Sequence, residues 1–198
     1  MIDVNRLTAA IPRWCAAMHA AAPELNELDG RLGDADLGVT LDKCATLIAQ
    51  AQTELPDSLE GIFKRLAQAS AKASGSSFGT LLTVAFMTAG KRCAGTQALG
   101  RADLATLLGE VVATLSARGG ANLGDKTVLD ALQAVHLAMA DASEEEDLRR
   151  IAIDAVGEAL DAFRDKPNRI GRARMFADKT IGMDDPGMVA LKRMVESI

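Results

Sequence analysis

The sequence has no tyrosine, and aromatic residues make up only 3% of its 198 positions. Strand-rich proteins usually fill their sheets with aromatic and β-branched side chains, so this shortage argues against a sheet fold. Alanine and leucine are abundant instead, and both favour helices that pack through small and aliphatic side chains. With 48% hydrophobic residues, the chain can bury a sizeable core. We therefore expect an all-α fold, with a single domain spanning residues 1–198.

Cysteine and histidine are also scarce. The cysteines Cys15, Cys44 and Cys93 are odd in number and far apart, and each lies in an apolar helical context. This pattern is typical of small core residues in a reducing compartment and predicts neither a disulfide nor a zinc framework. The histidines His19 and His136 lie far apart without a paired ligand, so the sequence favours core or surface roles for them over zinc binding.

Positive charge is in deficit, because the formal net charge is −5. Proteins that bind a nucleic-acid backbone usually carry a basic stripe, so we expect no nucleic-acid partner. The N-terminus does not resemble a signal peptide, and the uncharged run at residues 73–90 is polar enough to predict a buried helix rather than a membrane span. These features predict a cytoplasmic protein without membrane contact.

Apolar residues recur at helical spacing throughout the chain, for example at Leu41, Cys44 and Ile48. Pro23 is expected to begin a helix, and Pro12 either kinks the first helix or lies in its opening turn. Short connections between amphipathic helices favour antiparallel neighbours, so we predict an antiparallel up-and-down helical bundle or closed barrel of about eight helices. The expected helical ranges are 5–22, 24–32, 38–54, 58–73, 76–93, 102–118, 127–140, 144–165 and 187–197.

Three aspartates, Asp29, Asp34 and Asp36, fall close together where one helix is expected to end and the next to begin. Clustered carboxylates repel one another unless a cation lies among them, and hard oxygen ligands with flanking glycines suit Mg²⁺. The alternative is a helix C-cap followed by an N-cap. A calcium-binding EF-hand fits the segment less well, because the position of its bidentate glutamate is occupied by Ala45.

A second polar segment runs from about Lys166 to Pro186 and contains four cations, Arg169, Arg172, Arg174 and Lys179. Long loops in compact domains are usually either functional or disordered. The cations and the Gly/Pro framework also suit a loop folded over phosphates. A P-loop is absent, because the glycine that this motif requires before Gly90 and Lys91 is replaced by Ala85.

Four separated segments share a family pattern: LNELDGRLGDADLG (25–38), ASGSSFGT (73–80), GGANLGDKTVLDAL (119–132) and GRARMFADKTIGMDDPG (171–187). In order and approximate spacing they resemble the nucleotide-site motifs of the ADP-binding L subunit of dihydroxyacetone kinase, and the resemblance spans nearly the whole chain. The third segment is long and specific. The resemblance as a whole favours a folded Lys166–Pro186 segment, packed over phosphates, over a disordered one.

The resemblance implies a site for Mg²⁺ and for ADP or ATP, without a clear catalytic residue on this chain. The implied magnesium ligands are Asp29, Asp34 and Asp36. The implied nucleotide-binding residues are Leu37, Gly38, Val39, Thr40, Ser74, Gly75, Gly119, Val128, Arg172, Asp185, Pro186 and Gly187.

Two positions depart from the family pattern. The family commonly has histidine directly after the second aspartate of Gly-Asp-x-Asp, and this position is Leu37. The family's two glycines before Ala-Ser-Gly are Ala71 and Lys72. Leucine removes a hydrogen-bond donor near the expected phosphates, whereas Lys72 adds a charge.

The resemblance implies the phosphoryl-donor subunit of a multi-subunit kinase for dihydroxyacetone or a related small ketose. A partner subunit then holds the ketose through a hemiaminal bond to its own histidine. Bound ADP is rephosphorylated by a phosphohistidine protein of a sugar phosphotransferase system in one branch, and free ATP is the substrate in the other. The alternatives are the nucleotide domain of a fatty-acid kinase and a non-catalytic helical module that binds lipid or a partner.

Overall fold

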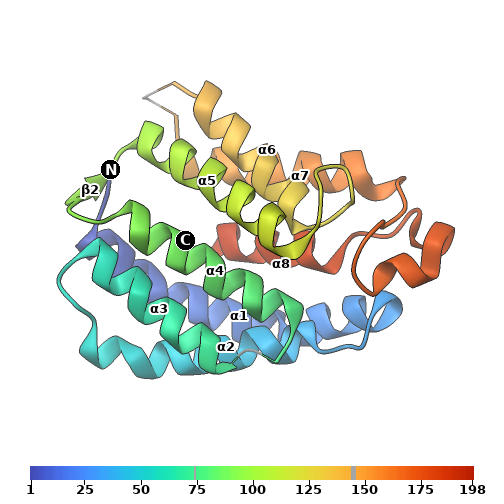
Figure 1. Cartoon of the computed structure of the whole chain (residues 1–198), viewed down its shortest axis with the longest axis horizontal. Coiled ribbons are helices and arrows are strands. Elements are labelled where there is room, and N and C mark those ends of the chain that lie inside the picture. The colour runs from blue at the N-terminus through green and yellow to red at the C-terminus, as the bar shows by residue number, and fades with distance from the viewer. Residues whose placement is uncertain (74, 144–145) are drawn as a thin grey trace.

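The computed structural model describes residues 1–73, 75–143 and 146–198, and helices dominate it (Figure 1). The α-helices of this described part are α1 (Val4–Leu32), α2 (Leu37–Ala51), α3 (Leu59–Ala73), α4 (Ser77–Arg92), α5 (Arg101–Gly119), α6 (Val128–Asp141), α7 (Leu148–Arg164) and α8 (Pro186–Ser197). Two 3₁₀ helices, η1 (Gln52–Glu54) and η2 (Ala173–Thr180), and two short antiparallel strands, β1 (Ile2–Asp3) and β2 (Ala98–Leu99), complete the order. The predicted all-α class is confirmed.

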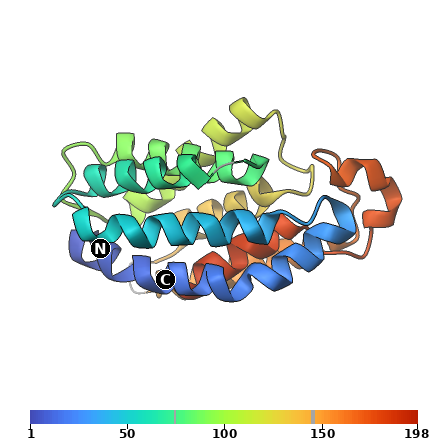
Figure 2. The same cartoon turned by 90° about the horizontal axis from the view of Figure 1, so that it is seen from below.

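The helices form a closed up-and-down ring. Each helix packs against the next in the chain, and α8 returns to pack against α1 (Figures 1 and 2). Because neighbours run in opposite directions, α2, α4, α6 and α8 all begin at the same end of the ring. This shared end is where the candidate site lies.

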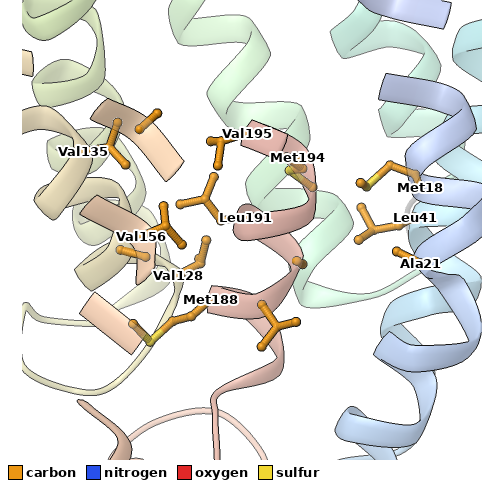
Figure 3. Packing of buried hydrophobic residues seen from close by; sticks show 14 of the residues in the cluster. Met18, Ala21, Leu41, Val128, Val135, Val156, Met188, Leu191, Met194 and Val195 are labelled. Atoms are coloured by element: carbon orange, nitrogen blue, oxygen red, sulfur yellow. The ribbon is translucent and has the colours of Figure 1, made fainter. Parts of the chain in front are cut away.

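The core forms where the apolar stripes of the helices meet, and α8 lies between the two halves of the ring. Figure 3 shows its apolar side chains between those of α6 and α7 on one side and those of α1 and α2 on the other. Met18 and Leu41 are fully buried, and each such side chain contributes about 1.5–3 kcal/mol to folding. The labelled members of this cluster are Met18, Ala21, Leu41, Val128, Val135, Val156, Met188, Leu191, Met194 and Val195.

The prediction of separate helices at 5–22 and 24–32 is wrong, because α1 is continuous and contains both Pro12 and Pro23. Proline removes one amide donor and crowds the preceding turn. Along its length α1 buries apolar residues from Ile11 to Leu32 against the rest of the ring. We attribute the continuity of the helix to this packing, which outweighs the local penalty at each proline. Pro23 therefore does not begin a helix.

The other helix boundaries agree within a few residues, with one exception. The predicted start of a helix at position 144 lies outside the described residues, and α7 begins at Leu148. Asp147 caps α7 by accepting a hydrogen bond from the Arg149 amide. The cysteines Cys15, Cys44 and Cys93 are free and buried as expected, and burial raises the pKa of the Cys15 and Cys44 thiols to about 11.

Within the described ranges, no helix combines the length and the apolar character that crossing a membrane requires.

Candidate functional site

The aspartate cluster, Asp29, Asp34 and Asp36, is assembled by the end of α1 and the turn into α2. One carboxylate oxygen from each residue lies within 4.8 Å of the others. The Asp29 Oδ2 atom accepts hydrogen bonds from the backbone amides of Asp36 at 2.9 Å and Leu37 at 3.3 Å. Asp29, which lies within α1, thus also binds the first amides of α2. The Asp36 side chain makes no capping bond.

The cluster concentrates negative charge. Partial burial, and secondarily the charge of Asp29, raise the pKa of the Asp36 carboxyl above its ordinary value. Arg172 balances part of the charge, because its Nη1 atom forms an ion pair with Asp34 Oδ2. Arg172 comes from the segment 166–185, which we call the lid. The lid is folded and contains η2, so the folded alternative for this segment is the one observed.

A cavity of about 540 Å³ extends from the cluster into the ring. The cluster and Arg172 line one end. Phe78, Leu81, Val84, Leu115 and Leu129 line the walls. The cavity therefore joins a charged end to an apolar slot, and its volume is typical of sites for small organic ligands.

Four helix N-termini meet at this cavity. The first residues of α2, α4, α6 and α8, which are Leu37, Ser77, Val128 and Pro186, all line it. The first amides of a helix have no partner within the helix, and the helix dipole adds partial positive charge there. The up-and-down topology thus surrounds the carboxylates with groups that favour phosphate.

Most sequence-predicted site residues meet in this cavity. Those that line it are Asp29, Asp34, Asp36, Leu37, Gly75, Gly119, Val128, Arg172, Asp185, Pro186 and Gly187. Gly38, Val39 and Thr40 follow along α2 but do not line the cavity. Ser74 lies outside the described residues.

The three α2 residues that do not line the cavity contribute in other ways. A side chain at Gly38 would overlap the carbonyl oxygen of Ala22, so this glycine permits close packing of α1 and α2. The Val39 amide donates to Asn26 Oδ1. Thr40 Oγ1 donates to Ser76 Oγ at 2.9 Å, and Ser76 lines the cavity. Thr40 therefore supports the wall from behind.

Sequence reasoning missed the apolar walls and much of the lid lining. Leu81, Val84 and Leu115 show the same helical periodicity as core residues, so no sequence signal separates them from the core. Arg118, beside the predicted Gly119, also lines the cavity. Ser76 and Ser77, which follow the predicted Gly75, line the cavity as well. The Ser76 side chain caps α4 by accepting from the Gly79 amide at 3.3 Å.

Asp185, the last residue of the lid, caps α8 and contacts Asn168 near the start of the lid. Its Oδ1 atom accepts a hydrogen bond from the Met188 amide at 3.0 Å, and its Oδ2 atom accepts one from the Asn168 side chain at 2.9 Å. Burial raises the pKa of the Asp185 carboxyl to about 6, although these hydrogen bonds and the nearby Lys126 favour the carboxylate.

The raised pKa predicts how stability varies with pH. Since the folded-state pKa exceeds the ordinary value of 3.8, the stabilising contribution of Asp185 is complete below that value and is lost as pH rises through about 6. Asp185→Asn stays neutral and can still cap α8, so the variant should not show this loss. Because Asp185 is only half-buried, we expect a gain at pH 7 of about 1–2 kcal/mol in the free energy of unfolding.

Urea unfolding of both metal-free proteins between pH 4 and pH 8 measures this difference. All other carboxyl groups are the same in both proteins, so the difference between the two curves of unfolding free energy against pH isolates Asp185. If the unfolding free energies of wild type and Asp185→Asn changed in parallel between pH 4 and pH 8, the prediction would be wrong.

A family model described as the DAK2 domain matches residues 31–198. The chain belongs to the DAK2 domain family. The DAK2 match includes Asp34 and Asp36 but begins after Asp29, which α1 brings to the cluster.

Relatives of this DAK2 domain include whole kinases and separate subunits. A D-erythrulose kinase of Mycolicibacterium smegmatis is 30% identical over 205 residues, which cover 85% of this chain and 35% of that protein. A PEP-dependent dihydroxyacetone kinase ADP-binding subunit, DhaL, of Listeria innocua is 27% identical over 164 residues, which cover 82% of this chain and 79% of that subunit. The chain thus spans about a third of the erythrulose kinases that it matches.

A solved structure also resembles this chain. The dihydroxyacetone kinase from C. freundii in complex with AMP-PNP and Mg²⁺ has a TM-score of 0.76 and 25% identity, in an alignment that covers 100% of this chain and 34% of that one.

Proposed function

We propose that this chain binds ADP or ATP with Mg²⁺ and is the phosphoryl-donor subunit of a kinase for dihydroxyacetone or a related small ketose. The observation that carries the proposal is the aspartate cluster at the end of the cavity where four helix N-termini meet. Carboxylates suit a hard cation, amides suit phosphate, and the apolar slot suits a nucleobase. The named kinases among the relatives support the same chemistry.

The donor set of the cluster fits Mg²⁺, because it offers carboxylate oxygens from three residues on one side and leaves the other side open to the cavity. Asp29, Asp34 and Asp36 would hold the metal. When bound, Mg²⁺ neutralises phosphate charge during phosphoryl transfer. In this scheme Arg172 exchanges its contact with Asp34 for a contact with phosphate. The positive ends of the α2 and α4 dipoles would favour the phosphate chain at this end of the cavity.

The acceptor ketose is proposed to lie on a partner subunit. None of the described residues that line the cavity is a histidine, lysine or cysteine, so this lining offers no imidazole for a hemiaminal bond and no amine or thiol for covalent capture of a ketone. The segments around the mouth expose apolar residues, and exposed apolar residues are typical of interaction surfaces. Exposed examples are Val39, Leu123, Met175 and Ile181.

The source of the phosphoryl group divides the proposal into two routes, namely a phosphohistidine protein that rephosphorylates resident ADP, or free ATP. The relatives include a subunit named as PEP-dependent and a protein named simply as a dihydroxyacetone kinase. The fatty-acid kinase and the non-catalytic module gain no support from the relatives described above.

Titration calorimetry tests the proposed nucleotide site. After removal of any co-purified nucleotide, ADP should bind with Mg²⁺ present, and chelation of the metal should weaken binding by at least about tenfold. AMP is the matched control, because it retains the base and ribose but lacks the β-phosphate. Equal affinity for ADP with and without Mg²⁺ would overturn the proposal.

A further inference from the structure

Lys126 is buried completely, which is unusual for a lysine. Its side chain is 0% exposed, and its backbone is left-handed, with φ of 63°. The ammonium group donates to three carbonyl oxygens, those of Arg164 at 3.1 Å, Lys166 at 2.7 Å and Thr180 at 2.9 Å. A lysine ammonium has three donors, so all of them are used.

These three carbonyls lie at the end of α7, at the start of the lid and at the end of η2 within the lid. Arg164 is the last residue of α7, Lys166 begins the lid, and Thr180 ends η2. Carbonyls at a helix C-terminus have no partner within the helix and carry partial negative charge, so a buried cation suits them. The Lys126 ammonium therefore closes the base of the lid as a clip.

A second group of hydrogen bonds, made by Asn168 and Thr180, lies beside the Lys126 clip. The Asn168 side chain donates to the Lys126 carbonyl at 2.8 Å and to Asp185 Oδ2 at 2.9 Å. The Asn168 amide donates to Thr180 Oγ1 at 2.8 Å, and this hydroxyl donates to the Ala177 carbonyl. The start of the lid is thereby joined to its end and to the first residue before α8.

The lid reaches the cavity, whereas the Lys126 side chain does not. Residues 170–173 line the cavity, and Arg172 pairs with Asp34 there, but Lys126 is not part of the lining. We propose that Lys126 is a positioning residue that fixes the base of the lid and thereby holds Arg172 over the phosphate end of the site. The effect of Lys126 on nucleotide binding rests on the proposed function, whereas its effect on the folding of the lid does not.

The charges around the ammonium are consistent with this role. Burial lowers the pKa of Lys126, and the nearby Asp185, Asp184 and Asp165 oppose that change. The ammonium is thus stabilised by carbonyls that it contacts and by carboxylates at the edge of the lid. An apolar side chain of similar length, as in Lys126→Met, would leave the Lys166 carbonyl without a donor, while the Arg164 and Thr180 carbonyls would keep only the amides of Gly182 and Met183.

Limited trypsin digestion of the nucleotide-free protein tests the clip. Arg169, Arg172, Arg174 and Lys179 are exposed cleavage sites within the lid. We expect Lys126→Met to accelerate cleavage at these sites at least tenfold, and Thr180→Val, which removes only the hydroxyl tie, to accelerate it about threefold.

Ile48→Ala is the control for general destabilisation, because Ile48 is buried in α2 outside the lid. Equal acceleration by Ile48→Ala, at an equal loss of melting temperature, would overturn the proposal. If Lys126→Met does not fold, the rates of lid cleavage in Thr180→Val and Ile48→Ala are compared instead. Equal rates in these two variants would overturn the proposal.

A double-mutant cycle tests whether the clip acts through Arg172. Lys126→Met should weaken ADP–Mg²⁺ binding about tenfold in wild type but less than twofold in an Arg172→Gln background. An equal loss in both backgrounds would show that Lys126 does not act through this arginine. Absence of ADP binding by wild type would refute the proposed function instead, and the trypsin experiment would still decide the clip.

Discussion

Replacing Asp34 or Asp36 by asparagine is expected to abolish binding of ADP with Mg²⁺ while the ring of helices stays folded. Neither side chain caps a helix. Asp36 makes no capping bond, and the contact of Asp34 is an ion pair with Arg172 of the lid. Loss of a metal ligand should weaken binding at least about a hundredfold, equivalent to about 2.7 kcal/mol. Calorimetry measures this loss.

The controls for this prediction follow from the same contacts. Asp42→Asn removes an equal charge from α2, where Asp42 pairs with His19, and should leave ADP binding unchanged. Asp36→Asn should raise the melting temperature of the metal-free protein, because it removes a carboxylate whose pKa is raised first by partial burial and then by the charge of Asp29. Asp29→Ala should instead lower stability by about 1 kcal/mol, since it removes the cap of α2. An equal ADP-induced rise in melting temperature in wild type, Asp34→Asn and Asp36→Asn would contradict the metal assignment.

The isolated chain is expected to phosphorylate no dihydroxyacetone, and turnover should appear only when a ketose-binding kinase subunit is added. The reason is the separation of donor and acceptor groups, because the described cavity offers carboxylates, amides and an apolar slot but no histidine, lysine or cysteine. Mass spectrometry of dihydroxyacetone phosphate, with ATP as donor and then with a phosphohistidine protein as donor, measures the product.

The Asp34→Asn chain mixed with the same partner is the control, because it should dock but not carry the metal. Product formation in that mixture would place the donor site elsewhere. Robust turnover by the wild-type chain alone would refute the division between subunits.

The sequence predicts the helices well because each carries an apolar stripe, and it errs where tertiary packing outweighs a local rule. Pro23 illustrates this: its local chemistry favours a helix start, but α1 continues through it as one packed helix. The end of α5 follows local chemistry, since Gly120 adopts a left-handed conformation and caps it.

The sequence predicts only part of the candidate site. The aspartates and Arg172 were identified from motifs, and the structure brings them together. Leu37 shows that a motif does not reveal whether a residue belongs to the core, to the site or to both. Its side chain is 5% exposed and belongs to the hydrophobic core, and it also lines the cavity. Lys126 lies in the motif at 119–132, but its buried role has no sequence signal, because lysine is normally exposed and its three acceptors come from distant positions in the chain.

The direction of α1 and α8 has a practical consequence for joining this domain to other polypeptides. Both chain termini point away from the mouth, with the N-terminus on the far side (Figures 1 and 2). At 1.5 Å per residue, α1 separates the N-terminus from the aspartates by about 40 Å, and α8 carries the C-terminus about 18 Å from the mouth. An affinity tag, a surface tether or a fused protein at either terminus would therefore leave the cavity open, so immobilised protein should remain accessible to nucleotide and partner.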